Sequence, residues 1–280
     1  MAAVTTSFRE LDSATIRAGL APDTTTLLRQ LTVLDTVDST NLFLQRLPPA
    51  QQHGHAVVAD WQESGRGRRG RSWHSPPGGN IYLSLGWKFS ASADSLARLP
   101  LAVAVCAARA IQQAGVAAVG IKWPNDIQMD GKKLAGILLD VQNDAAGGLV
   151  AAIGVGVNVS MPADALACAA IDQAWADVCS YTGQAIADDF RDRLCGMLLD
   201  GLLRGLNLYA AQGFSAFAEE WNRLDVLRGR LITIVGEHET ASGTAAGISG
   251  RGGLLVQGTG PAGSPSLREF LAGELSVRIS

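Results

Sequence analysis

The stretch from Glu63 to Trp73 constrains the fold most, because it fits neither a helix nor a strand. It reads Glu-Ser-Gly-Arg-Gly-Arg-Arg-Gly-Arg-Ser-Trp, so that four arginines are interleaved with three glycines. Glycine disfavours the interior of both regular elements, and neighbouring guanidinium groups repel one another. The elements on either side must therefore end here. The stretch is predicted to be a loop that is mobile until an anion binds.

The residues of this Arg/Gly loop leave three interpretations open. Guanidinium groups form forked hydrogen bonds to carboxylate and phosphate oxygens, and glycine lets backbone N–H groups approach an anion. The loop can therefore close over a small anionic ligand, but it can also be a solvated basic loop or an RNA contact. A net charge of −3 and a pI of about 5.8 argue against a dedicated nucleic-acid-binding protein, which is usually basic.

Composition indicates an ordinary globular protein. The 280 residues are 47% hydrophobic and 18% charged, which is typical of a chain with a large core. No basic region followed by an apolar core opens the sequence, so no signal peptide is predicted. The longest apolar run, Leu99 to Ile111, is short and contains Arg109, so no membrane span is predicted. A cytoplasmic location is the expectation.

The cysteines and histidines give no sign of a metal site. No two cysteines form a Cys-x-x-Cys pair, and no histidine has ligand spacing with acids or cysteines. All are interpreted as free thiols or ordinary side chains: Cys106, Cys168, Cys179, Cys195, His53, His55, His74 and His238.

Apolar patterns and turn residues predict an α+β fold. Strands are predicted at 31–37, 55–61, 80–89, 119–123, 127–129, 133–141 and 149–159, and helices at 42–47, 94–114, 186–209 and 214–224. After Asp225, short strands are predicted at 231–235, 240–248, 254–257, 268–271 and 274–279. The expected layout is a short N-terminal appendage (1–30), a mixed α/β domain (31–225) and a small antiparallel β domain (226–280).

Lys122-Trp123-Pro124-Asn125-Asp126 follows a predicted strand. Proline fixes the chain's exit, so the lysine, asparagine and aspartate emerge together at the end of the strand. Such a cluster can hold phosphates and a divalent cation. A capped turn, in which Asp126 accepts from a backbone N–H, is the alternative.

Two further segments are candidates for ligand contact. Lys133 enters an apolar strand, where an ammonium group is costly unless an anion pairs with it; a solvent-facing strand end is the alternative. In Gly154-Val155-Gly156-Val157-Asn158, glycines alternate along a strand. A flat ligand can lie against such a backbone. The alternative is that the glycines contact no ligand and allow a bulge or tight packing within the sheet.

These segments together, in this order, closely resemble the biotin protein ligases. The resemblance rests on Asp-Ser-Thr-Asn (38–41), Gly-Arg-Gly-Arg-Arg-Gly-Arg (65–71), Lys-Trp-Pro-Asn-Asp (122–126), Lys-Leu-Ala-Gly-Ile-Leu (133–138) and Gly-Val-Gly-Val-Asn (154–158), and it extends to Gly273–Arg278. It implies a mixed sheet flanked by helices, similar to class II aminoacyl-tRNA synthetases, and an SH3-like C-terminal β-barrel. It also implies an ATP-dependent ligase that makes biotinyl-5′-AMP from biotin and transfers the biotin to one lysine of a carrier domain.

The resemblance also implies roles for individual residues. Those expected around biotin are Ser39, Thr40, Gln62, Gly65, Arg66, Arg68, Lys133, Gly136 and Gly154. Those expected around ATP are Arg68, Arg71, Trp73, Asn80, Lys122, Asn125, Asp126, Lys133 and Asn158. Arg66, Arg68 and Lys133 are the candidate catalytic residues, because they can stabilise the charge that builds up when two anions react. Asp126 is the candidate Mg²⁺ ligand.

The resemblance implies partners as well. The expected partner is the biotin carboxyl carrier protein of acetyl-CoA carboxylase. Some family members carry an N-terminal DNA-binding domain, but residues 1–30 are too few for one, so no specific DNA binding and the monofunctional form are expected. Family members often pair through sheet edges, which makes a homodimer of that kind an expectation. The rivals are a lipoate or octanoate ligase, a nucleic-acid-binding module and a regulator that binds biotinyl-adenylate without transferring it.

Overall fold

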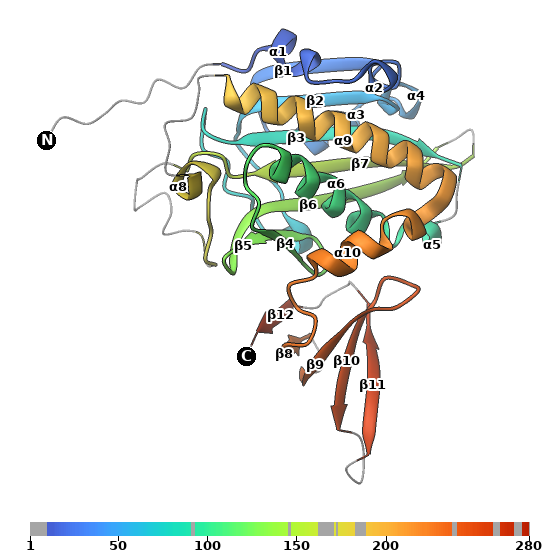
Figure 1. Ribbon diagram of the computed structural model, residues 1–280. Helices are drawn as coiled ribbons and strands as arrows, with labels where there is room; N and C mark the ends of the chain where they lie inside the picture. The colour runs from blue at the N-terminus through green and yellow to red at the C-terminus, as the bar shows by residue number, and fades with distance from the viewer. Residues whose placement is uncertain are drawn as a thin grey trace, which may run out of the picture.

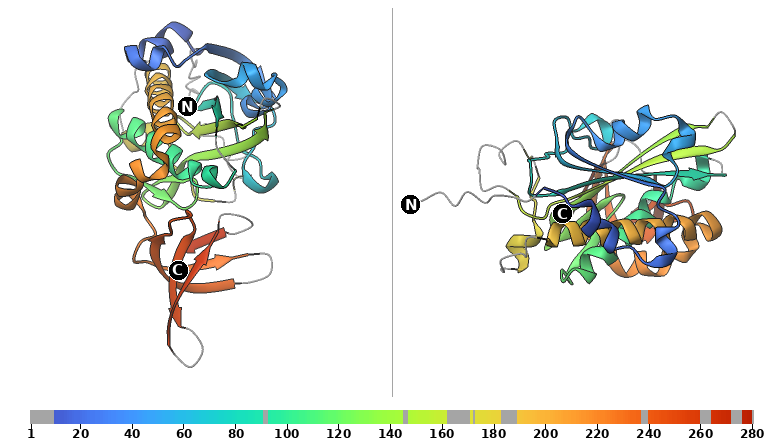
Figure 2. Two further views of the ribbon diagram at one scale, coloured as in Figure 1. Left: turned by 90° about the vertical axis from the view of Figure 1, so that its right-hand side faces the viewer. Right: turned by 90° about the horizontal axis from the view of Figure 1, so that it is seen from above.

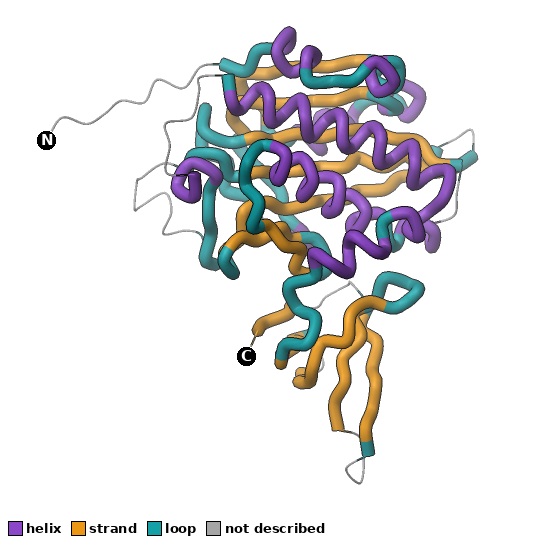
Figure 3. Tube along the Cα trace, in the orientation of Figure 1, coloured by secondary structure: helices purple, strands orange, loops and turns teal. Residues whose placement is uncertain are grey.

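A computed structural model describes residues 10–90, 93–144, 147–161, 171, 173–182, 189–236, 240–259, 264–271 and 276–279. The described residues form a seven-stranded sheet and, from the last part of the chain, a five-stranded sheet (Figure 1). Helices accompany only the larger sheet, as the colouring by secondary structure in Figure 3 shows. The α+β class predicted from the sequence is therefore confirmed.

The larger sheet is mixed. Its strands are β1 (Gln30–Val37), β2 (His55–Gln62), β3 (Ile81–Phe89), β4 (Val119–Lys122), β5 (Asp126–Met129), β6 (Lys132–Asn143) and β7 (Leu149–Val157). They lie in the order β1-β2-β3-β7-β6-β5-β4. Only β1 and β2 pair in parallel, and every other neighbouring pair is antiparallel. The predicted strands match these bounds closely because turn residues mark most of their ends.

Helices cover both faces of this sheet. On one side lie α1 (Ser13–Ala18), α6 (Leu99–Gln113), α9 (Phe190–Gln212) and α10 (Ala218–Leu224), and on the other α3 (Thr40–Arg46) and α4 (Pro49–Gln52), as the right-hand view of Figure 2 shows. In β2, Val58 belongs to the main core and Val57 to a smaller cluster with Leu44 of α3. Because both faces are covered, β2 is apolar almost throughout and does not alternate.

The helix predicted at 94–114 is divided in two. The structure has α5 (Ala93–Leu96) and α6 (Leu99–Gln113), and Pro100 stands in the first turn of α6. Proline lacks an N–H group and is tolerated in a first turn but not in a helix interior. The expectation of one continuous helix was therefore wrong, and Pro100 is the reason.

The N-terminal segment packs into the main core. α1 and α2 (Pro22–Thr25) lie against α9, and Ile16 is fully buried. The backbone N–H of Asp12 donates to Asp192 of α9 at 3.1 Å, and that of Ala21 donates to Asp200 at 2.9 Å. The boundary predicted at residue 30 therefore does not coincide with a break in packing, and residues 10–29 share the core of the larger sheet.

The C-terminal sheet is antiparallel throughout. It consists of β8 (Leu231–Val235), β9 (Thr240–Ile248), β10 (Leu254–Thr259), β11 (Pro265–Phe270) and β12 (Ser276–Ile279), in the order β11-β10-β9-β8-β12. Within the described residues, its two outer strands do not pair, so this part of the sheet is open. Trp123 donates from its indole nitrogen to the carbonyl of Gly252 at 3.0 Å and thereby links the two sheets.

The described cysteines agree with the prediction of free thiols. Cys106, Cys179 and Cys195 form no disulfide, and burial raises the pKa of Cys106 and Cys195 to about 12. Cys168 and His238 lie outside the described residues. Among the helices that the structure describes, none combines the length and the apolar character that a membrane crossing requires.

Asp225 lies where the chain passes from α10 towards the C-terminal sheet. Its Oδ1 accepts from the N–H of Leu227 at 2.9 Å, whereas its buried Oδ2 has no hydrogen-bond partner among the described residues. Burial raises the pKa of this carboxyl group above its usual range. Folding therefore makes this carboxyl group easier to protonate than it is in the unfolded chain.

This position predicts a pH-dependent effect on stability. A carboxyl group with a raised folded-state pKa contributes stability at low pH, which is lost as the pH rises through that pKa. We therefore expect Asp225→Asn to raise the melting temperature at pH 8 by about 2 °C and by less at pH 4. Thermal unfolding at the two pH values measures this, with Glu219→Gln on the exposed side of α10 as the control. An equal shift at both pH values would contradict the assignment.

Candidate active site

One cavity of about 260 Å³ gathers most of the segments that the sequence singled out. Its walls come from the start of α3, the end of β2, the Arg/Gly loop, and strands β3, β5, β6 and β7, with Trp175 from the segment before α8 (Val178–Thr182). These segments are far apart in the chain, and the sheet order places them side by side. The cavity is therefore the candidate active site.

The start of α3 supplies neutral polar groups. Ser39 is the N-cap of the helix in an extended conformation, with φ of −158°, and its N–H donates to the carboxylate of Asp38 at 2.8 Å. Ser39 and Thr40 are 2% and 4% exposed. The N–H of Thr40 donates to Oε1 of Gln62 at 3.0 Å, which joins the helix start to the end of β2. The structure thus gathers at one end of the cavity three residues that the resemblance places around biotin.

The Arg/Gly loop has a defined backbone. Gly67 donates to the carbonyl of Arg71 at 2.7 Å, and Trp73 donates to that of Gly65 at 2.8 Å. Its only regular element is a short 3-10 turn, η1 (Arg68–Gly70). The expectation of a loop without a helix or an extended strand is therefore confirmed.

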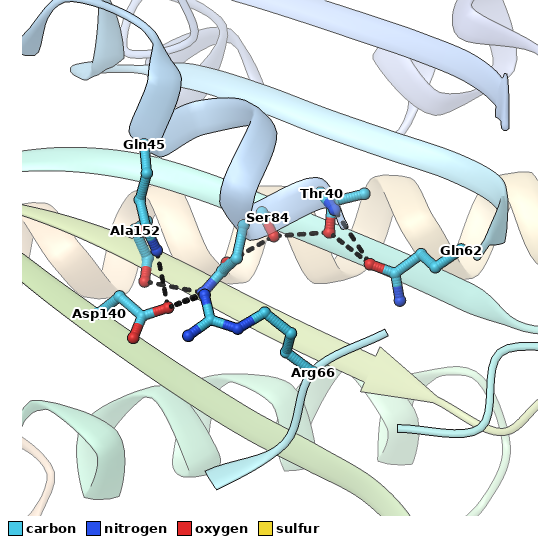
Figure 4. Close-up of polar contacts among 8 residues, drawn as sticks. Thr40, Gln45, Gln62, Arg66, Ser84, Asp140 and Ala152 are labelled. Carbon is cyan, nitrogen blue, oxygen red and sulfur yellow. Dashed lines mark hydrogen bonds and ion pairs between the residues drawn. The ribbon is translucent and has the colours of Figure 1, made fainter. Parts of the chain in front are cut away.

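Two arginines of this loop point to different ends of strand β6. A terminal nitrogen of Arg66 lies 3.3 Å from Oδ2 of Asp140, whereas Arg68 donates to Oδ1 of Asn125 at 2.9 Å. Figure 4 shows Arg66 reaching Asp140. Asp140 and Lys133 lie on β6 about 23 Å apart at 3.3 Å per residue. The structure therefore brings Arg68, but not the Arg66 guanidinium, to the Lys133 end.

Lys133 has the partner that its position requires. Its Nζ lies 2.9 Å from Oδ1 of Asp126, and its side chain is 16% exposed. The same ammonium group lies 5.2 Å from the ring centre of Trp73, within the range of a cation–π interaction. The prediction that this strand lysine pairs with an anion is confirmed, and the solvent-facing alternative is not.

The alternating glycines make room for Trp73. A Cβ atom at Gly156 would lie 2.6 Å from the indole of Trp73, and one at Gly136 would lie 2.9 Å from it. A Cβ at Gly154 would meet Oδ1 of Asn41 at 2.9 Å. The sequence suggested a flat ligand against the 154–158 backbone, whereas in the structure the group that lies over Gly136 and Gly156 is the protein's own indole.

The cations near Asp126 are partly removed from water. Burial lowers the pKa of Lys122 and of Arg68, and in both cases the charge of Asp126 acts in the opposite direction. Cations with reduced hydration bind an incoming anion more strongly than fully hydrated ones do. This end of the cavity therefore suits an anionic ligand such as a polyphosphate.

The structure brings most of the predicted residues to the cavity wall. The lining residues that the sequence predicted are Ser39, Thr40, Gln62, Arg66, Arg68, Arg71, Trp73, Asn125, Asp126, Lys133, Gly136, Gly154 and Asn158. Gly65, Asn80 and Lys122 do not line it. Asn80 is fully buried and accepts from the backbone N–H of Val159 at 2.9 Å, so it supports β7 instead.

Several lining residues were missed by sequence reasoning. Among them are Asn41, Ser84, His74 and Trp175. Ser84 interrupts an apolar strand, and that is a signal for an inward-facing polar group. Asn41 belongs to the Asp-Ser-Thr-Asn motif (38–41), but the resemblance assigns it no role at the site. Nothing near Trp175 in the sequence indicates a cavity, because Trp175 reaches the site through a bridge to Lys133.

Comparisons with known proteins agree with this site. The model of the biotin/lipoate A/B protein ligase family matches residues 33–159. The biotin–[acetyl-CoA-carboxylase] ligase of Paracoccus denitrificans is 33% identical over 248 residues, which cover 86% of this chain and 100% of that protein. The chain belongs to the biotin/lipoate A/B protein ligase family. The ligase is also 30% identical to the bifunctional ligase/repressor BirA of Escherichia coli, over 88% of this chain and 73% of that one.

Solved structures lead to the same family. The biotin protein ligase of Aquifex aeolicus, in complex with biotin and ATP, matches this ligase with a TM-score of 0.72 at 27% identity. The match covers 90% of this chain and 100% of that chain. The match therefore extends over most of this chain and the whole of the other.

Proposed function

We propose that this ligase joins biotin to ATP, releases pyrophosphate and transfers the biotinyl group from the resulting adenylate to a lysine of a carrier domain. The main support for the proposal is that one cavity has two chemically different ends. One end presents neutral hydrogen-bonding groups from Thr40 and Gln62, and the other presents the cations of Arg68 and Lys133.

The neutral end suits the ring of biotin. A ureido group has two N–H donors and one carbonyl acceptor and no charge, so it binds best to hydroxyl and amide groups. Ser39, Thr40 and Gln62 supply those groups, and their burial excludes water that would compete for them.

The cationic end suits the reacting groups. A carboxylate oxygen of biotin attacks the α-phosphorus of ATP, a new P–O bond forms, and the bond to the leaving pyrophosphate breaks. Both reactants are anions, so the rate depends on fixed positive charge and on orientation. Arg68 and Lys133 supply that charge, and Asp126 and Asn125 hold the two side chains in place. No nucleophile of the protein is required.

The cationic end of the cavity can hold Mg²⁺ only when the phosphates of ATP supply further ligands. Among the described residues no group of three histidine, cysteine or acidic side chains could hold a metal ion. Asp126 is the one carboxylate among the described lining residues. Mg²⁺ commonly binds through one or two carboxylates together with substrate phosphates and water. Asp126 would hold the ion, which would neutralise phosphate charge when bound.

Transfer completes the proposed reaction. The amine of the carrier lysine attacks the acyl carbon of the adenylate, an amide bond forms, and AMP leaves. The adenylate is a mixed anhydride that water would hydrolyse, so the Arg/Gly loop protects it by excluding water. The expected carrier is the biotin carboxyl carrier protein of acetyl-CoA carboxylase.

The proposal extends to the fold of the C-terminal sheet, the cellular location and the oligomeric state. We infer an SH3-like barrel for the C-terminal sheet, action in the cytoplasm, and a homodimer through a sheet edge. The antiparallel order of β8 to β12 supports the first inference. The outermost position of β1 in the larger sheet leaves one edge available for the last.

Pyrophosphate release tests the function directly. The purified ligase with Mg²⁺ and ATP is expected to release pyrophosphate on addition of biotin and not on addition of lipoate, the other acid of the family's name. Mass spectrometry should then find one modified lysine on an added biotin carrier domain. Release with lipoate but not with biotin would overturn the assignment of biotin.

A further inference from the structure

A chain of hydrogen bonds, buried up to Asn41 and partly buried beyond it, runs from the neutral end of the cavity to Asp140, which does not line the cavity (Figure 4). Oδ2 of Asp140 accepts from Nδ2 of Asn41 at 3.1 Å, from Nε2 of Gln45 at 2.7 Å and from Arg66 at 3.3 Å. A carboxylate can only accept hydrogen bonds. Every group that faces it must therefore turn a donor towards it.

Asp140 in this way fixes the orientation of the Asn41 amide. Its Nδ2 faces Asp140 and lies 3.5 Å from the carbonyl of Ala152, so Oδ1 must point the other way. Oδ1 accepts from the hydroxyl of Ser84 at 2.7 Å. Asn41 is 2% exposed, so a lost hydrogen bond of its amide is costly. The donor and the acceptor are thereby determined for two hydrogen bonds, Asn41 to Asp140 and Ser84 to Asn41.

The donors in the remaining hydrogen bonds follow from the fact that each hydroxyl group has only one proton to donate. A hydroxyl group has one proton, and the proton of Ser84 is used on Asn41. Thr40 Oγ1 lies 2.8 Å from Ser84 Oγ, so the proton of Thr40 must point to Ser84. Thr40 Oγ1 also lies 3.2 Å from Oε1 of Gln62 and can donate to it, but only by giving up the shorter bond to Ser84, so with its proton on Ser84 it faces Gln62 with lone pairs.

The opposite end of the chain is fixed as well. Ser75 donates from its hydroxyl to the carbonyl of Trp73 at 3.0 Å and accepts from Nε2 of Gln62 at 3.0 Å. Oε1 of Gln62 must therefore point back to Thr40, where it accepts from the backbone N–H. Two acceptors, Thr40 Oγ1 and Gln62 Oε1, are thus presented together. Their complement in a ligand is an N–H donor.

We propose that Asp140 is a positioning residue that makes this end of the cavity select a ligand N–H group. The inference rests on the proposed function, because it assigns the N–H group to the ureido ring of biotin. Asp140 acts through Asn41 and Ser84 and touches no substrate. Its bond to Arg66 also ties the Arg/Gly loop to the same chain.

Removal of the Asp140 carboxylate allows the chain to reverse. The Asn41 amide can then turn Nδ2 towards Ser84, and the hydroxyl of Ser84 can turn its proton towards Thr40. The proton of Thr40 is then free to point to Oε1 of Gln62 or to a ligand acceptor in the cavity. An oxygen atom in the ligand ring is then accepted where an N–H group was required. Discrimination between donor and acceptor rings should fall, and ATP binding should not change.

The experiment compares biotin with its two cyclic carbamate analogues, in each of which an oxygen atom replaces one ring N–H group. Dissociation constants are measured by calorimetry for the wild type, Asp140→Leu and Asp140→Asn. The wild type is expected to prefer biotin to at least one analogue by about tenfold, the ratio that one hydrogen bond of about 1.4 kcal/mol gives. Asp140→Leu should bring that ratio close to one. Asp140→Asn should retain most of it, since an amide oxygen can still accept from Asn41.

Controls separate this role from a structural one. Asp144→Leu removes the carboxylate that pairs with Lys88 at the turn of the β6–β7 hairpin, outside the hydrogen-bonded chain, and should leave the ratio unchanged. Ser84→Ala interrupts the chain inside the cavity and should lower the ratio even if Asp140→Leu fails to fold. Unchanged ratios in both Asp140→Leu and Ser84→Ala would overturn the proposal. Failure of the wild type to bind biotin would instead overturn the proposed function.

Discussion

Lys133→Ala is expected to lower the rate of pyrophosphate release by on the order of a hundredfold or more, the usual loss when a preorganised charge is removed from a reacting centre. The ammonium group lies 2.9 Å from Asp126 and over the ring of Trp73, so it is fixed before substrate arrives. Its removal also leaves the Asp126 carboxylate without its cation, and that carboxylate then repels the incoming phosphates. Both effects act on the same step.

The measurement is single-turnover pyrophosphate release with saturating biotin and ATP. Lys132→Ala is the matched control, because Lys132 is the adjacent residue and its side chain is exposed. Its rate should stay close to that of the wild type. Binding of biotin alone to Lys133→Ala should weaken much less than the rate falls. A near-normal rate for Lys133→Ala would show that the salt bridge only stabilises the strand.

Arg68→Ala is expected to reduce adenylate formation by about a hundredfold, whereas Arg66→Ala should act mainly on biotin binding. Arg68 donates to Asn125 at the cationic end, and burial lowers its pKa, so its charge is poorly screened by water. Arg66 instead pairs with Asp140 behind the neutral end. The two arginines are two positions apart in one loop, yet they should differ in which kinetic constant changes.

Steady-state kinetics with either substrate varied can separate the two effects. For Arg68→Ala, kcat should fall at saturating biotin and ATP. For Arg66→Ala, kcat at saturation should stay within about threefold of the wild type, while KM for biotin rises. The same loss of kcat in both variants would mean that the loop reorganises and brings both guanidinium groups to the phosphates. That outcome would contradict the division of roles seen in the structure.

The fold was largely predictable because local signals mark most of its elements. Turn residues such as Asp130-Gly131 set the ends of β5 and β6. Lys133 was correctly predicted to pair with an anion, since an unpaired ammonium group in an apolar strand is costly. The break between α5 and α6 escaped prediction. Apolar residues continue on both sides of Pro100, and the apolar pattern alone does not show where one helix ends and the next begins.

The orientation of the arginines could not be predicted from their own segment. Arg66 and its partner Asp140 are separated by 74 positions, and Arg68 and Asn125 by 57. Such pairs are decided by strand order, which the loop sequence does not contain. The sequence does contain a signal for Asp140, because this residue interrupts the apolar run of β6. A single acid in a strand has many explanations, and only the position of Asn41 shows which of them applies.

The indole of Trp73 gives the ligase a built-in optical reporter. Trp73 lies on the cavity wall beside the ammonium group of Lys133, and a nearby cation alters the emission of an indole. Trp87, Trp123 and Trp221 are buried away from the cavity and supply a steady background signal. An anion that draws Lys133 away from the ring changes the local field at Trp73, and Trp175→Phe removes the signal of the second tryptophan on the cavity wall. Entry of each substrate can therefore be followed by fluorescence without any label.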